Sequence, residues 1–273
     1  MPSAADKRRA FRKLHETGCF VMPNPWDVGS TLYLQSLGFK ALATTSAGFA
    51  WTLGLDDGGI TRDMAIAHIA EVSAKADVPF NADFEGGFAH EPGGVGESVR
   101  LACETDVSGL SIEDYTGNRA TPLYDVDMAV ARIKAARAAI DKSGADVLLT
   151  GRSEGFIRGR PDLDETIARL KAYAAAGADC LYAPGLSTRE QISAVVTAVA
   201  PKPVNILIGT PLPLTVKDIE ELGGRRISVG GAMARVYWGA VGRMAREIID
   251  EGTFQGFGDG MPGADLNKLF SGR

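Results

Sequence analysis

The chain is short of the features that mark several classes of protein. It has no hydrophobic run long enough to cross a membrane, and the segment before Cys19 lacks the apolar core of a signal peptide. Cys19, Cys103 and Cys180 are widely spaced, which excludes a disulfide framework and a C-x-x-C metal knuckle. The formal net charge of −5 argues against a nucleic-acid partner bound through its phosphates. We therefore expect a cytoplasmic protein with reduced cysteines, and neither a membrane nor a nucleic acid as its partner.

What the chain does contain is a regular alternation of two patterns. Short apolar runs rich in Val, Ile and Leu alternate with longer segments of helical period, and this occurs eight times. The apolar runs are continuous, as in strands that are buried on both faces. The predicted strands are residues 19–22, 41–45, 78–83, 109–113, 147–151, 179–183, 204–208 and 227–230. Eight such repeats favour a closed (β/α)8 barrel over an open doubly wound sheet.

The helical segments have recognisable ends, and no linker interrupts them. Residues 125–142 and 163–176 are the clearest helices, and Asp162, Thr215 and either Ser187 or Thr188 are the predicted N-caps. Because α/β barrels commonly reach 273 residues as one domain, we predict a single barrel domain over residues 1–273 with a C-terminal helical tail. We expect the amphipathic segment 264–270 in this tail to pack on the barrel or on a neighbouring subunit.

Polar side chains follow the predicted strands where each one ends. Asn81, Asp83 and Glu85 close the third strand, Glu113 closes the fourth, and Arg152 follows the fifth. The carboxyl ends of barrel strands meet at one face, so these side chains are expected to converge there. Carboxylates suit magnesium, and a guanidinium binds a carboxylate in a bidentate manner. The pattern therefore predicts a metal site beside an anion clamp.

Each of these residues also has a simpler interpretation. Two acids after a strand can be an ordinary polar loop, and Arg152 can be a buried ion-pair partner of Glu154. A third possibility is a barrel that binds a phosphosugar at Gly230 and Gly231, before the last predicted helix of the barrel.

Five short motifs at the predicted strand ends carry a family resemblance. They are TTSAG at 44–48, GLDDG at 54–58, NAD at 81–83, SIED at 111–114 and GRSE at 151–154. In this order and spacing they resemble the isocitrate lyase and phosphoenolpyruvate mutase superfamily over nearly the whole chain. The resemblance implies a (β/α)8 barrel, often with its last helix exchanged between the subunits of a dimer or tetramer. It also implies magnesium, with manganese as an alternative, and a 2-oxo acid or enolpyruvate-like substrate.

The resemblance also implies a role for individual residues. Ser46 and the backbone amides of Ala47 and Gly48 would hold the substrate carboxylate, and Asn205 and Trp26 would line the pocket. The metal would be bound, directly or through water, by the acids Asp57, Asp83, Glu85 and Glu113. Arg152 would bridge the carboxylate and the enolate oxygen, and Glu113 would act with it in catalysis.

Two departures from the family pattern shape the functional prediction. Asn81 replaces the first carboxylate of a D-x-D motif, with Glu85 as the expected substitute, and residues 114–125 lack the catalytic cysteine of isocitrate-type lyases. We therefore expect no cleavage of isocitrate or 2-methylisocitrate. Decarboxylation of a 2-oxo acid such as oxaloacetate is the first choice. Phosphonate chemistry, as in phosphoenolpyruvate mutase or phosphonopyruvate hydrolase, is the second, and a non-catalytic carboxylate-binding barrel is the alternative from another class.

Overall fold

Eight parallel strands form a nearly closed barrel in the computed structural model, which describes residues 2–271. The strands are β1 Phe20–Met22, β2 Leu42–Ala43, β3 Phe80–Asp83, β4 Gly109–Glu113, β5 Leu148–Arg152, β6 Cys180–Tyr182, β7 Val204–Leu207 and β8 Arg226–Ser228. The strand order is β1-β8-β7-β6-β5-β4-β3-β2. At the seam between β1 and β2, the Ala43 amide donates to the Pro23 carbonyl oxygen at 3.0 Å. The predicted (β/α)8 barrel is confirmed.

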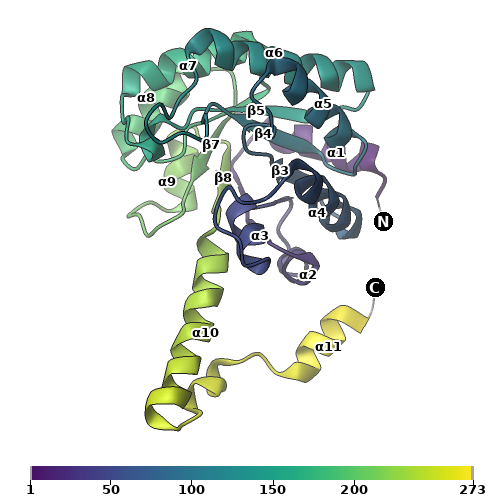
Figure 1. The fold of residues 1–273 in the computed structure, drawn as a ribbon, viewed down its shortest axis with the longest axis vertical. Helices are drawn as coiled ribbons and strands as arrows, with labels where there is room; N and C mark the ends of the chain where they lie inside the picture. Colours follow the sequence, from purple (N-terminus) through teal and green to yellow (C-terminus); the bar gives the residue numbers. More distant parts are fainter. Residues whose placement is uncertain (1, 272–273) are drawn as a thin grey trace.

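Helices follow the strands, and most of them cover the outside of the barrel (Figure 1). They are α1 Ala4–Leu14, α2 Val28–Ser36, α3 Ser46–Thr52, α4 Arg62–Lys75, α5 Pro92–Cys103, α6 Val126–Ser143, α7 Leu163–Ala175, α8 Arg189–Val199, α9 Val216–Glu221, α10 Ala232–Glu251 and α11 Gly263–Ser271, with short 3-10 helices at Gly155–Arg158 (η1) and Gln255–Asp259 (η2). Asp162, Thr188 and Thr215 are N-caps as predicted, because each side chain accepts a backbone N–H of its own first turn. Ser187 is not a cap.

Helix α1 closes the end of the barrel at which the strands begin. Phe11 is fully buried and packs edge-on against Phe20, the first residue of β1, and against His15. A Cβ at Gly109, the first residue of β4, would lie 2.7 Å from the Phe11 ring. The strand starts are therefore sealed, and access to the barrel interior is from the strand ends.

The last helices leave the barrel. Figure 1 shows α10 projecting from the barrel, with α11 returning toward α2. Ala234 is the buried residue of α10, while Val236, Trp238 and Ile249 are 69%, 46% and 80% exposed. Exposed apolar side chains of this kind are typical of interaction sites.

No helix within residues 2–271 is both long and apolar enough to span a membrane.

Candidate active site

A cavity of about 810 Å³ opens where the strands end. Its lining includes Ser46 of α3, Asp83 of β3, Glu113 of β4, Arg152 of β5 and Asn205 of β7. These residues are far apart in the sequence and meet because parallel strands bring their carboxyl ends to one face. The convergence predicted from the strand ends is therefore present.

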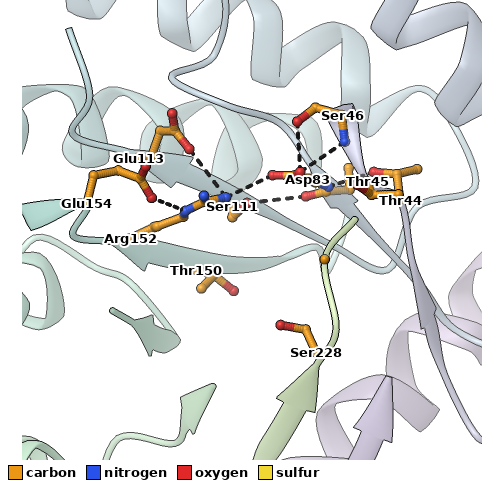
Figure 2. A network of polar contacts seen from close by, with 12 residues as sticks. Thr44, Thr45, Ser46, Asp83, Ser111, Glu113, Thr150, Arg152, Glu154 and Ser228 are labelled. Carbon is orange, nitrogen blue, oxygen red and sulfur yellow. Dashed lines mark hydrogen bonds and ion pairs between the residues drawn. The ribbon is translucent and has the colours of Figure 1, made fainter. Parts of the chain in front are cut away.

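Arg152 is the centre of the polar contacts in this cavity (Figure 2). Its Nη1 lies 3.0 Å from Asp83 Oδ1 and 3.3 Å from Glu113 Oε2, and its Nε donates to Glu154 Oε1. The guanidinium also lies beside the Tyr182 ring, 5.0 Å from the ring centre. The sequence left open that Arg152 is simply an ion-pair partner of Glu154, and this ion pair is present. Arg152 also pairs with Asp83 and Glu113, two acids of the predicted site.

Asp83 connects Arg152 to the start of α3. The backbone amide and the hydroxyl of Ser46 both donate to Asp83 Oδ2, at 3.0 and 2.9 Å. The Asp83 amide in turn donates to Thr44 Oγ1 at 2.7 Å. Ser46 therefore directs two donors at a carboxylate, which is the chemistry predicted for it, but the carboxylate here belongs to the protein.

The lining of the cavity combines four acids with five arginines, which are Arg119, Arg132, Arg152, Arg158 and Arg226. Asp57, Asp83, Glu85 and Glu113 are these acids, and Glu154 lies fully buried behind Arg152, whereas Arg152 and Arg158 are the two arginines paired with this group. Burial, and then repulsion from Glu154, raises the pKa of Glu113 well above its usual range. Burial, and then repulsion from Asp83, raises the pKa of Asp57. The same two causes raise the pKa of Glu85 to about 7. Burial is the largest cause of each of these shifts, and repulsion between the acids adds to it.

Glu85 sits in an unusual backbone conformation. Its φ is +46° and that of Phe88 is +54°, in the left-handed region that favours glycine. Its Oε1 is buried and has no hydrogen-bond partner in the part of the chain that is described. Arg132 of α6 holds this loop by donating to the carbonyl oxygens of Gly86, Ala89 and His90. A strained backbone held this firmly is typical of functional sites.

The acids do not form a ready-made ligand cluster. Within residues 2–271, no three His, Cys, Asp or Glu side chains are grouped so that they could hold a metal ion directly. Glu113 and Asp83 both pair with Arg152, while Asp57 and Glu85 line the cavity from other segments.

The remaining predicted binding residues have different positions. Ala47 lines the cavity with Ser46, but Gly48 and Trp26 are not part of its lining. A Cβ at Gly48 would lie 2.6 Å from the Thr45 side chain, so glycine is required for packing there, and Trp26 lies against Tyr237 of α10. Asn205 lines the cavity, but its amide already bonds Ser228 and Arg226.

Arg158 and Arg132 are among the cavity arginines that were not predicted from the sequence. Arg158 on η1 donates to Glu154 Oε2 at 2.9 Å and lies 3.7 Å above the Tyr115 ring. Arg158 follows Glu154 by four residues, and this spacing is the sequence signal that indicates an ion pair between them. Arg132 gave no comparable signal, because its acceptors are backbone carbonyls of a distant loop.

Comparison with known proteins places this geometry in a family. The sequence model of the phosphoenolpyruvate phosphomutase family matches residues 11–249. A crystal structure provisionally named a lyase/mutase, from Burkholderia cenocepacia J2315, is 46% identical with a TM-score of 0.96, covering 98% of this chain and 97% of that one. An oxaloacetate decarboxylase of Paraburkholderia xenovorans is 30% identical over 83% of this chain and 75% of its own length. A 2-methylisocitrate lyase of Halalkalibacterium halodurans is 26% identical over 91% and 83%. The chain belongs to the phosphoenolpyruvate phosphomutase family, within the phosphoenolpyruvate mutase/isocitrate lyase superfamily.

Proposed function

We propose that the protein is a magnesium-dependent enzyme that cleaves a C–C bond of a small 2-oxo acid through an enolate, as in decarboxylation of oxaloacetate. The observation that carries this proposal is the position of Arg152, which lies among Asp83, Glu113 and Glu154 in the cavity of about 810 Å³ at the strand ends. A guanidinium held in this way can bind a carboxylate and stabilise the negative oxygen that develops beside it.

The cavity acids fit a divalent cation. Glu85 Oε1 is buried without a partner, and the raised pKa values of Asp57 and Glu85 reflect burial together with mutual repulsion. We propose that Asp83, Asp57 and Glu85 hold magnesium, or manganese in its place, largely through water, since magnesium keeps several waters and needs only one or two direct carboxylates. The ion would polarise the substrate's oxo group.

The other residues would bind and orient the substrate. Ser46 and the Ala47 amide would donate to its carboxylate, in place of the present bond to Asp83. Arg152 would bridge this carboxylate and the enolate oxygen, and Glu113 would hold the guanidinium in the required orientation. Enolate stabilisation is the demanding part of decarboxylation, and this arrangement supplies it.

The cysteines support decarboxylation over cleavage of isocitrate-type substrates. Cys19 and Cys180 lie on or beside strands β1 and β6, and Cys103 ends α5. None of the three lines the cavity, and burial raises the pKa of each thiol. Residues 114–125, where related lyases carry their catalytic cysteine, place Tyr115 and Arg119 at the cavity instead.

Phosphonate chemistry is the second candidate. Its support is the match to the phosphomutase family together with Arg119, which faces the cavity and could bind a phosphonate group. It needs the same enolate stabilisation by Arg152.

Product analysis by NMR distinguishes these reactions. The protein is incubated with magnesium and, in turn, oxaloacetate, phosphonopyruvate, isocitrate and 2-methylisocitrate, with protein-free magnesium samples as controls. We expect pyruvate to form from oxaloacetate faster than in the control, and no product from the two isocitrates. Glyoxylate from isocitrate, or oxaloacetate decay at the control rate, would contradict the proposal.

A further inference from the structure

A second buried arginine lies inside the barrel below Arg152. Arg226 is the first residue of β8, is 1% exposed, and contributes to the lining of the cavity. It donates from Nη2 to Thr150 Oγ1 at 3.0 Å. Thr150 lies two residues before Arg152 on β5, which is about 6.6 Å of strand, so Arg226 contacts β5 at a deeper level than the strand end.

The other partners of Arg226 are also uncharged. Its Nε donates to Asn205 Oδ1 at 2.8 Å, and its Nη1 lies 3.3 Å from His15 Nε2. His15 Nδ1 lies 2.7 Å from the Phe11 carbonyl oxygen, so that nitrogen carries the proton and Nε2 is a neutral acceptor. Within the described chain, no carboxylate pairs with Arg226.

This environment differs from that of Arg152 and Arg169, and also from that of Arg132, which is 1% exposed and donates to three backbone carbonyl oxygens. Arg152 pairs with three carboxylates, and Arg169, which is 4% exposed, pairs with Asp114 and Glu165. A buried charge is costly unless an opposite charge accompanies it. A guanidinium has five N–H donors, and the three contacts of Arg226 leave two of them uncommitted. Arg226 therefore has both the charge and the donors to bind an anion.

We propose that Arg226 forms an anion subsite on the floor of the cavity and binds the second carboxylate of a dicarboxylic substrate. This inference rests on the proposed function, in which Ser46 and Arg152 bind the first carboxylate. Both arginines line the same cavity. Thr150 and Asn205 hold the Arg226 side chain from two sides, so its fork is fixed before the ligand arrives.

Malate and lactate form a matched pair of probes, since they differ by one carboxylate and resemble oxaloacetate and pyruvate without being cleaved. Calorimetric titration in the presence of magnesium measures the affinity of each. We expect the wild-type protein to bind malate more tightly than lactate. Arg226→Met should weaken malate binding thirtyfold or more and change lactate binding less than threefold. The control is Arg225→Met, whose side chain bonds the Gly18 carbonyl oxygen outside the cavity, and it should alter neither affinity.

A measurement on the wild-type protein covers the case in which Arg226→Met does not fold. The assigned Nε–Hε resonance of Arg226 in NMR spectra should shift on saturation with malate and stay in place with lactate. Equal binding of the two acids by the wild-type protein, equal losses in Arg226→Met, or an unmoved resonance would each overturn the subsite. Tight malate binding without turnover of any 2-oxo acid would refute the proposed activity and leave the subsite standing.

Discussion

At the scale of single residues, Arg152 gives the most direct test of the proposed chemistry. Arg152→Lys keeps the charge but loses the planar fork that contacts Asp83 and Glu154 on different nitrogens. We expect kcat/KM to fall about a hundredfold or more, as for the loss of a transition-state contact of a few kcal/mol. Steady-state kinetics provide the measurement, with Arg100→Lys on the outer surface of α5 as the control. Kinetics like those of the wild type would mean that Arg152 has a structural role.

Asp83 tests the metal assignment. Asp83→Ala should abolish magnesium-dependent activity with little loss of folding stability, because this carboxylate lies among other acids of the cavity. Calorimetric titration with magnesium measures the effect, and Asp63→Ala, an exposed acid at the start of α4, is the matched control. Magnesium affinity unchanged by Asp83→Ala would remove this residue from the site.

The sequence predicted these two residues because each ends a buried strand, and strand ends converge in a barrel. It could not predict that Ser46 would contact Asp83, since that contact depends on how α3 is placed over β3. The role of Arg226 could not be predicted from the sequence either. A charged residue at the start of an apolar run resembles an ordinary strand boundary, and only the closed barrel shows that its side chain points inward.

At the scale of elements, prediction and structure agree most closely for helices whose ends are marked by both periodicity and a capping residue. Helices α6 and α7 begin and end within one residue of the prediction, since period and capping residue both mark their ends. Strand β2 is shorter than predicted, at Leu42–Ala43 rather than 41–45. Thr45 is the N-cap of α3 and accepts the Gly48 N–H, so the chain turns into a helix before the apolar run ends.

Helix α1 should make folding stability depend on pH. Burial, and then the charge of Arg226, lowers the pKa of His15 from 6.5 to about 3. The unfolded chain therefore binds a proton that the folded chain excludes, and stability falls as the pH drops below about 6.5. Between pH 6.5 and 4.5 the expected loss is about 2 kcal/mol.

His15→Gln isolates this contribution, because glutamine keeps an acceptor for Arg226 but does not titrate. Urea unfolding at both pH values should show a smaller loss for the variant than for the wild type. His68, whose pKa is lowered to about 4 mainly by burial, titrates in both proteins and cancels in the comparison. Equal losses in the two proteins would contradict the assignment to His15.

At the scale of the whole molecule, α10 predicts an oligomer. Val236 and Ile249 lie near opposite ends of this projecting helix and are 69% and 80% exposed. We expect two or four copies of the chain to cover this surface by exchanging their last helices. Sedimentation should give a dimer or tetramer for the wild type and a monomer for the double variant Val236→Glu and Ile249→Glu. Lys134→Glu, on the outer face of α6, should keep the wild-type state, and a monomeric wild type would refute this expectation.

The double attachment of Asp83 has a consequence for the order in which ligands bind. In the free protein, Asp83 competes with an incoming acid for Ser46 and for Arg152. A cation that engages Asp83 weakens this internal competitor, so magnesium and the acid should bind synergistically. Thermodynamic reciprocity requires each to increase the affinity of the other by one common factor, about tenfold if the coupling is of ordinary size. Titrating lactate with and without magnesium, and magnesium with and without lactate, should therefore give the same ratio, and that ratio should shrink toward one in Ser46→Ala.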